Sequence, residues 1–376
     1  MKEKKSMDQQ RHKRIIISGG GTGGHIFPAI SVANALRRIE PGIEILFVGA
    51  EGRMEMERVP SAGYRIVGLP VAGFYRSITF RNVKVVIKLI KSLSLARRII
   101  KEFNPDVVVG VGGYASGPVL WQAGTLGIPT LIQEQNSYAG LTNKLLARKA
   151  SKICVAYEGM EKYFPAGKII KTGNPVRQNY DDLTNIKEEA YSFFNLNKES
   201  PVILILGGSL GAEKINKSLS LNLNKLQSSG CQWLWQTGKL YFENVEAQVS
   251  AALRKNISLH AFINRMDYAY AVCDIIISRA GAGTISELCL VSKPVILVPS
   301  PNVAEDHQTK NAMALSEKEA AILVPDNQAI EKLVDEAITL VGDGDKKIRL
   351  TENISRMADR NSDIRIAEEV LKLAKE

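Results

Sequence analysis

Five of the six residues from Gly19 to Gly24 are glycine, and the stretch GGGTGGHIFPA places a histidine directly after them. Glycine loses more conformational freedom on folding than other residues, so such a stretch indicates that something approaches the backbone closely. It follows the apolar run Ile15–Ile17 and precedes a helical pattern from Ala29 to Arg38. Backbone N–H groups at a helix start bind anions when no Cβ atom obstructs them. We therefore expect a phosphate or diphosphate site, although a purely structural strand-to-helix turn fits the same residues.

The same glycines also fit a dinucleotide-binding fingerprint. Gly19, Gly21 and Gly24 have the spacing G-x-G-x-x-G after a predicted strand. The fingerprint requires an acidic residue about 20 positions further on, and Glu51, which follows the run ILFVGA, lies somewhat late for this role. An NAD(P)-dependent oxidoreductase is therefore one alternative.

Two more glycine turns follow apolar runs. GVGGYASGP spans residues 110–118, and GGSLGA begins at Gly207. The second turn matches the G-x-S-x-G nucleophile elbow of hydrolases, for which Ser209 would need a later acid and histidine, such as Asp274 and His307. A serine hydroxyl that donates to a phosphate oxygen explains Ser209 more simply.

The composition is that of a globular protein with a surplus of positive charge. The 376 residues are 45% hydrophobic and carry a formal net charge of +10, which favours an anionic partner. We see no secretory signal and no run of the ~18 apolar residues that a spanning helix needs. The four cysteines form no CxxC pair and indicate buried thiols in a reducing, cytosolic compartment.

Short β-branched runs alternate with helical patterns along the chain, which predicts parallel sheets covered on both faces. The charged segment from Asn174 to Ser200 lacks strand character and separates two series of runs. We therefore expect an α/β protein with two Rossmann-like, doubly wound domains. The expected strands are 15–18, 43–48, 107–111, 130–133, 152–155 and 169–172, then 202–206, 232–236, 257–261, 275–278, 294–298 and 321–324.

Four polar stretches follow predicted strands, where ligands bind in doubly wound sheets. They are QEQN at 133–136, TGNPVR at 172–177, SRAGAGTISE at 278–287 and EDHQTKNA at 305–312. Taken singly, each has a structural explanation as a helix cap, a surface ion pair or a solvated side chain. Together with the three glycine turns, their order resembles the GT-B glycosyltransferases of family 28, from Ile15 to about Ala312.

This resemblance implies two Rossmann-like domains that face a cleft. Residues 14–177 would bind the acceptor and dock on a membrane, and residues 178–376 would bind UDP-N-acetylglucosamine, with the terminal helix packing back on the first domain. The implied reaction is inverting transfer of N-acetylglucosamine to the muramyl hydroxyl of lipid I, the undecaprenyl-diphosphate-linked N-acetylmuramyl-pentapeptide, which gives lipid II in peptidoglycan synthesis. A non-catalytic nucleotide-sugar-binding module is a further alternative.

The family pattern, carried over residue by residue, also implies the substrate contacts. The backbone of Ile263 would meet the uracil edge, and Glu287 would accept hydrogen bonds from the ribose hydroxyls. Gln308 and Asn136 would read the sugar hydroxyls, and the turn at Thr22 would lie near the reacting groups and the acceptor diphosphate. The whole implied set is Thr22, Gly23, Gly24, Asn136, Arg177, Ser209, Ile263, Ala282, Gly283, Thr284, Ile285, Ser286, Glu287 and Gln308.

An inverting displacement needs a base for the hydroxyl proton and positive groups near the leaving diphosphate. His25 is the preferred base, because a histidine pKa of about 6.5 suits proton transfer near neutrality. A helix-start histidine that bonds its own loop is the alternative for His25; Glu134 is the fallback base, and His307 is weaker. Helix starts with Ser209 and Arg177 would hold the diphosphate, so we expect no metal and no cofactor.

A lipid acceptor implies membrane docking on the cytoplasmic face of the plasma (inner) membrane. The segment from Val71 to Arg98 places Phe74, Tyr75 and Phe80 before Lys84 and Lys88, and basic amphipathic helices lie on anionic surfaces. A core helix with a solvated cationic face is the alternative. We expect Trp121 and Leu120 nearby, cell-wall synthesis and division proteins as candidate partners, and no nucleic acid, because only the net charge would support one.

Overall fold

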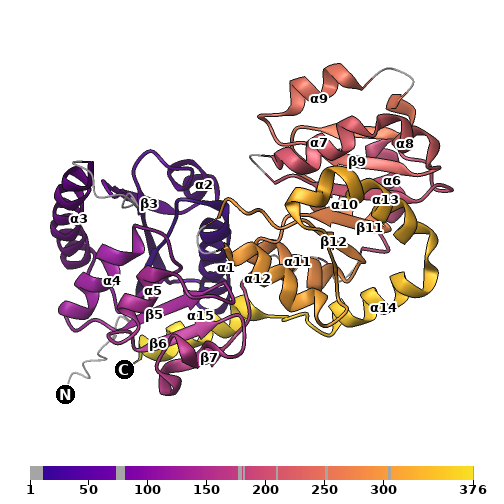
Figure 1. The fold of residues 1–376 in the computed structure, drawn as a ribbon. Coiled ribbons are helices and arrows are strands. Elements are labelled where there is room, and N and C mark those ends of the chain that lie inside the picture. Colours follow the sequence, from indigo (N-terminus) through magenta and orange to yellow (C-terminus); the bar gives the residue numbers. More distant parts are fainter. Residues whose placement is uncertain are drawn as a thin grey trace, which may run out of the picture. The chain divides into compact units, whose positions relative to one another are not determined.

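The computed structural model describes residues 12–72, 81–176, 180, 183–208, 211–249, 253–303 and 306–375. The chain divides into two compact units (Figure 1). The first comprises residues 1–176 and 361–376, and the second comprises residues 177–360. The first unit thus ends one residue before the expected boundary at 177, and residues 361–376 belong to it instead of to the second unit.

The first unit contains a seven-stranded parallel sheet in the order β3-β2-β1-β4-β5-β6-β7. Because the strand order reverses between β1 and β4, the turns after these two strands lie side by side, as at the ligand sites of doubly wound sheets. Apolar runs had not predicted β3, whose sequence RIVGL is only partly buried. The strands are β1 (Arg14–Ser18), β2 (Glu44–Ala50), β3 (Arg65–Leu69), β4 (Val107–Gly110), β5 (Thr130–Glu134), β6 (Lys152–Val155) and β7 (Ile169–Lys171).

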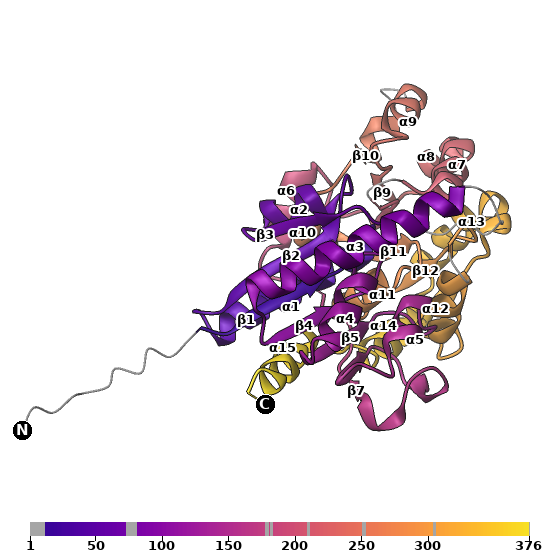
Figure 2. The ribbon, with the colours of Figure 1, turned by 90° about the vertical axis from the view of Figure 1, so that its left-hand side faces the viewer.

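Helices cover both faces of this sheet, because successive strand residues point to opposite sides. Ile15 and Ile17 share a core with α1 (Gly23–Ile39), α2 (Glu55–Ser61) and α15 (Ser362–Leu373). Ile16 shares the other core with α3 (Arg81–Phe103), α4 (Ser116–Thr125) and α5 (Leu141–Leu146). Figure 2 views the first unit from the side on which α3 lies.

The terminal helix α15 packs along α1 in the first unit. The Arg365 guanidinium donates to the carbonyl of Thr172, with Nη2 at 2.6 Å, and Arg38 pairs with Asp363 at 3.0 Å. The charged stretch from 345 onward forms two helices, α14 (Gly344–Ser355) and α15. Asn361 separates them with a left-handed φ of 59°, which a continuous helix does not tolerate.

The second unit repeats this plan with a six-stranded parallel sheet in the order β10-β9-β8-β11-β12-β13. The turns after β8 and β11 are neighbours, and Trp233 and Trp235 fill the core on one face of the sheet. The strands are β8 (Val202–Leu206), β9 (Gln232–Gln236), β10 (Ile257–His260), β11 (Ile275–Ser278), β12 (Val295–Leu297) and β13 (Ile322–Leu323). The helices are α6 (Lys187–Phe194), α7 (Glu213–Leu221), α8 (Leu223–Ser228), α9 (Phe242–Gln248), α10 (Met266–Val272), α11 (Ala282–Val291), α12 (His307–Ser316), α13 (Ala329–Gly342) and α14.

Candidate functional site

The helix after β1 begins inside the glycine turn. α1 starts at Gly23, six residues before the helical pattern at Ala29, so His25 lies in its first turn. The N–H groups of Gly23 and Gly24 therefore belong to the helix start, where backbone donors have no acceptor within the helix. The hydroxyl of Thr22 lies 3.3 Å from Nδ1 of His25. The turn thus combines two helix-start N–H groups, a hydroxyl and an imidazole.

The turn after β4 supports the His25 ring. A Cβ atom at Gly112, which has a left-handed φ of 93°, would lie 2.8 Å from Cδ2 of His25. A Cβ atom at Gly113 would collide with the carbonyl of Gly20. The GVGG sequence is therefore needed for close packing of the two turns, and this packing sets the position of His25.

A buried carboxylate that the sequence did not reveal holds the glycine turn. Glu55 at the start of α2 is 1% exposed and accepts hydrogen bonds from the N–H of Gly21, at 3.0 and 3.1 Å, and of Ala50, at 2.9 Å. Gly21 is the second glycine of the dinucleotide fingerprint, where a pyrophosphate approaches the backbone. A carboxylate in that place repels a pyrophosphate, which argues against the oxidoreductase alternative. The N–H of Gly21 is thus occupied by Glu55, whereas the N–H groups of Gly23 and Gly24 lie at the start of α1, where an anion can bind.

The carboxylate of Glu134, the fallback base, accepts hydrogen bonds from residues that follow it in the chain. Its carboxylate is 2% exposed and accepts from the backbone N–H of Asn136 and Gly140, both at 3.0 Å. It also accepts from the side-chain amides of Asn136, at 3.2 Å, and Asn143, at 2.8 Å. Four donors and burial favour a positioning role over proton transfer. The contact fixes Asn136, one of the expected sugar-reading residues.

The EQN and GNP motifs meet in a buried amide network. Gln135 donates to the carbonyl of Val111 at 2.7 Å, and Gln133 donates to Asn174 at 3.2 Å. Asn174 in turn donates to the carbonyl of Gln135 at 3.0 Å. All three amide side chains are buried. The motifs at the ends of β4, β5 and β7 are therefore joined through side chains, and Gln133, Gln135 and Asn174 serve the framework of the site.

In the second unit, the motif SRAGAGTISE forms the start of α11. Gly281 precedes the helix, and a Cβ atom at Gly283 would meet nothing within 4 Å, so the helix start borders open space. Arg279 in the same motif does not serve an anion there. Its Nη1 pairs with Asp326 at 2.6 Å and donates to the carbonyl of Val298 at 3.0 Å. The groups of this turn that can bind an anion are therefore the backbone N–H groups and the hydroxyl of the partly exposed Thr284.

Three other expected donor-binding residues have defined hydrogen bonds in this unit. The Tyr180 hydroxyl donates to Oε1 of the half-buried Glu287. The N–H of Ile263 donates to Oε1 of Gln236 at 2.9 Å, so a uracil oxygen would have to replace that bond. Oε1 of Gln308 accepts from the N–H of Ser300 at 2.9 Å. The NH₂ group of the same side-chain amide therefore points away from Ser300.

The structure separates the residues of the hydrolase alternative. Asp274 precedes β11, where it accepts from the N–H of Val202 at 2.7 Å. His307 begins α12, beyond the opposite, carboxyl end of β12. Since each strand residue adds about 3.3 Å, the length of the sheet keeps the two side chains apart. Ser209 lies outside the described residues, as do Arg177, Phe74, Tyr75 and Phe80.

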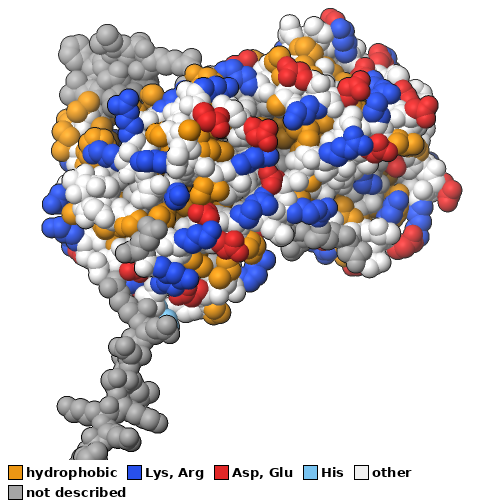
Figure 3. All heavy atoms as spheres, turned by 90° about the horizontal axis from the view of Figure 1, so that it is seen from below, with side chains coloured by type: hydrophobic (Ala, Val, Ile, Leu, Met, Phe, Trp, Pro, Cys, Tyr) orange, Lys and Arg blue, Asp and Glu red, His pale blue; other side chains and the backbone are white. Residues whose placement is uncertain are grey.

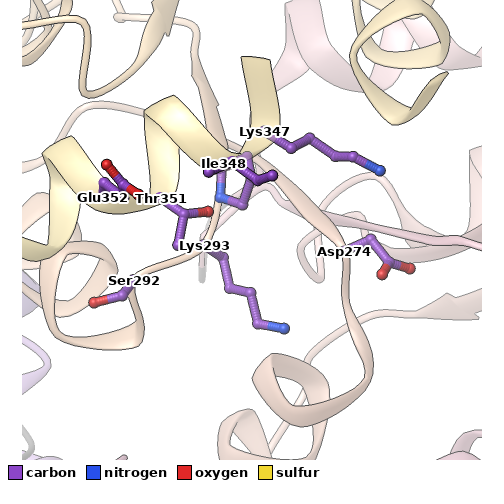
Figure 4. A pocket seen from close by; sticks show the side chains of 8 residues that line it. Asp274, Ser292, Lys293, Lys347, Ile348, Thr351 and Glu352 are labelled. Atoms are coloured by element: carbon purple, nitrogen blue, oxygen red, sulfur yellow. The ribbon is translucent and has the colours of Figure 1, made fainter. Parts of the chain in front are cut away.

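A hollow of about 370 Å³ at the amino edge of the second sheet is distinct from these groups (Figure 4). It lies where β11 and β12 begin, whereas the expected donor-binding residues follow the carboxyl ends of strands. Its lining residues are Asp274, Ser292, Lys293, Pro294, Lys347, Ile348, Thr351 and Glu352. Within the described ranges, no group of three or more His, Cys, Asp or Glu side chains is arranged to hold a metal ion.

The first unit carries an exposed apolar and basic surface on α3, α4 and α5, here called the α3–α5 surface. On α3, Ile87 and Ile90 are 49% and 62% exposed beside the exposed Lys84 and Lys88. Trp121 on α4 is exposed, with the Lys149 ammonium 3.7 Å from its ring centre. The expectation for Leu120 was wrong, because that side chain is 3% exposed and belongs to the core of the unit. The further exposed apolar members are Val86, Leu141 and Leu145.

Hydrophobic and basic side chains are interspersed over the left-hand part of Figure 3, where the first unit lies. No helix among the described residues is long and apolar enough to cross a membrane.

Known proteins share both units of this fold. The glycosyltransferase family 28 N-terminal domain matches residues 15–155, and the family's C-terminal domain matches residues 202–368. The crystal structure of MurG from Acinetobacter baumannii covers 96% of this chain and 99% of its own, with a TM-score of 0.75 and 27% identity.

Two curated relatives carry the name UDP-N-acetylglucosamine–N-acetylmuramyl-(pentapeptide) pyrophosphoryl-undecaprenol N-acetylglucosamine transferase. The protein of Parabacteroides distasonis is 58% identical over 96% of this chain, and that of Bacteroides thetaiotaomicron is 59% identical over 97%. Each relative is itself covered over 99% of its length. The two doubly wound units define the class of GT-B glycosyltransferases. Within it, the chain belongs to glycosyltransferase family 28.

Proposed function

We propose that this chain transfers N-acetylglucosamine from UDP-N-acetylglucosamine to N-acetylmuramyl-(pentapeptide) pyrophosphoryl-undecaprenol. The observation that carries this proposal is the identity of 58–59% over nearly the whole chain to transferases of that name. Both family domains are present, and each unit places a glycine turn and a helix start at the carboxyl edge of its sheet. Two anion sites suit a reaction in which both substrates carry a diphosphate.

In this proposal the second unit binds the donor. The N–H groups at the start of α11 and Thr284 face a phosphate, and Glu287 accepts hydrogen bonds from the ribose hydroxyls. The side-chain amide of Gln308 donates to a sugar hydroxyl, because its oxygen already accepts from Ser300. The roles of Ser209, Arg177, Ala282, Gly283, Ile285 and Ser286 in the donor site also belong to this proposal.

The first unit binds the acceptor and supplies the base. The acceptor hydroxyl attacks C1 of the sugar, the bond from C1 to the diphosphate oxygen breaks, and UDP leaves with the bonding pair. His25 takes the hydroxyl proton, and the N–H groups of Gly23 and Gly24 bind the acceptor diphosphate. The Gly112 and Glu55 contacts hold this turn before substrate arrives. Glu134 acts by holding Asn136.

Steady-state transfer and UDP binding together test these roles. We expect His25→Ala to lower kcat by about 10²–10⁴-fold, the usual contribution of a general base, and to leave UDP affinity unchanged. Glu287→Ala should weaken UDP binding and raise the donor KM. His12→Ala, at an exposed histidine of the same unit, is the matched control and should behave as wild type. Full turnover by His25→Ala would contradict the assignment of the base.

We further propose that the α3–α5 surface docks the protein peripherally on the anionic cytoplasmic face of the plasma (inner) membrane. Exposed isoleucines would enter the lipid interface while lysines contact anionic headgroups, each worth about 1 kcal/mol near a charged surface. The test is sedimentation with phosphatidylglycerol vesicles. Ile87→Ser with Ile90→Ser should reduce binding, and Ile348→Ser, an equally exposed isoleucine of the second unit, should not. Equal binding by all three proteins would refute this docking surface.

A further inference from the structure

Tyr180 is a buried tyrosine that meets the ribose-binding carboxylate expected in the second unit. Its side chain is 8% exposed, and its hydroxyl donates to Oε1 of Glu287. Tyr180 lies outside every motif that the sequence offered as a site, and it is 107 residues away from Glu287 along the chain. A hydrogen bond from a phenol to a carboxylate is charge-assisted and stronger than one between neutral groups.

The Tyr180 ring is itself held by a second aromatic residue. Tyr270 on α10 packs edge-on against it, with ring centroids 5.3 Å apart and an interplanar angle of 86°. The Tyr270 side chain is fully buried. This edge-to-face arrangement is one of the favourable geometries for aromatic pairs. The hydroxyl of Tyr180 is therefore presented to α11 by a ring with little freedom to move.

Glu287 needs such a partner because of its own position. It lies on the second turn of α11 and is only partly buried, and a glutamate side chain loses up to about 2 kcal/mol of rotamer entropy when it is fixed. A carboxylate that is already fixed loses less rotamer entropy when a ligand binds. A carboxylate accepts about four hydrogen bonds, so the bond from Tyr180 does not by itself prevent Glu287 from binding a diol.

We propose that Tyr180 is a positioning residue that orients Glu287 and thereby sets the preference of the donor site for ribose over deoxyribose nucleotides. This inference rests on the proposed function, in which Glu287 binds the ribose hydroxyls. Tyr180 acts on the ribose contact alone, because the phosphate groups bind the start of α11 through backbone N–H groups. Loss of the Tyr180 hydroxyl therefore weakens the binding of ribonucleotides more than the binding of deoxyribonucleotides.

The test is calorimetric titration of the full chain with UDP and with 2′-deoxy-UDP. Wild type should prefer UDP, and Glu287→Gln should lose most of that preference. Tyr180→Phe should reduce the preference by about 3- to 10-fold through weaker UDP binding, with 2′-deoxy-UDP affinity changed less than about 2-fold, as expected for the loss of one hydrogen bond of ordinary net strength. In turnover, Tyr180→Phe should raise the donor KM and leave kcat unchanged.

Tyr268→Phe is the matched control, because Tyr268 is another buried tyrosine of this unit, on α10. It should keep the wild-type preference. A ratio of two affinities does not depend on the fraction of folded protein, so a loss of stability in Tyr180→Phe does not imitate the expected result. A wild-type preference in Tyr180→Phe, with the preference lost in Glu287→Gln, would overturn this inference and leave the ribose role of Glu287 intact. A wild-type protein without any preference for UDP would refute that ribose role, and this inference with it.

Discussion

Replacing Glu55 tests whether a buried carboxylate maintains the glycine turn at His25. Glu55→Ala removes the acceptor for the N–H groups of Gly21 and Ala50. The Ala50 bond is buried, and a buried donor left without an acceptor costs about 1–3 kcal/mol, whereas the N–H of the exposed Gly21 can bind water instead. We therefore expect a loss of about 1–3 kcal/mol in the free energy of unfolding. Glu55→Gln retains one oxygen and should lose about half as much. The loss would be a large part of a typical domain stability of about 5–15 kcal/mol.

Urea unfolding and hydrogen exchange of residues 19–25 provide the assay. Unfolding of the first unit should shift to lower urea in Glu55→Ala, and the turn should exchange faster than the rest of that unit. Transfer activity should fall because His25 lies in the same turn, whereas UDP affinity, assigned to the second unit, should stay unchanged. Glu57→Ala removes an exposed carboxylate from the same helix and should change stability by less than about 0.5 kcal/mol. If Glu55→Ala unfolds and exchanges like Glu57→Ala, the carboxylate does not hold the turn.

Three further predictions concern other groups of the two units. Gly112→Ala places a Cβ atom against the His25 ring at a left-handed φ, and should lower kcat and cost at least about 1 kcal/mol of stability, measured by turnover and urea unfolding. Burial raises the pKa of Cys154, Cys273 and Cys289 to about 12, so iodoacetamide at pH 8 should label these thiols only after unfolding; rapid labelling of the native protein would contradict their burial. Burial lowers the pKa of His260, so the unfolded chain binds that proton more readily, and stability should fall as pH drops below about 6.5. His260→Gln should reduce this fall, measured as the thermal midpoint at pH 5 and pH 7.

The strands could be predicted from sequence wherever their residues are continuously apolar. Buried runs such as Val202–Leu206 have no competing explanation, because a strand covered on both faces is hydrophobic throughout. β3 was missed, since its RIVGL sequence includes an exposed arginine and a glycine. The start of α1 at Gly23 was also missed, because glycine is a poor helix former and only the surrounding turns hold it in helical conformation.

The partners that position the candidate site residues could not be predicted in the same way. Glu55 acts on the backbone N–H of Gly21, 34 residues earlier in the chain, and Tyr180 acts on a carboxylate 107 residues later. Neither side chain stands in a recognisable motif, and neither contact follows from local periodicity. Arg279 lies inside the SRAGAGTISE motif, yet its guanidinium pairs with Asp326. These two residues meet only when the chain is folded. Motifs thus predict which residues meet substrate, whereas the structure shows which side chains hold those residues in place.

Incubation of the wild-type chain with labelled UDP-N-acetylglucosamine and a lipid I analogue is the first measurement to make on the proposed transfer. We expect label to move to the acceptor, UDP to be released in equal amount, and NMR to show a β linkage at the sugar C1, inverted from the α-linked donor. Saturable UDP binding without transfer would contradict the proposed reaction and leave a nucleotide-sugar-binding protein. Transfer with retained configuration would contradict the single displacement assisted by His25.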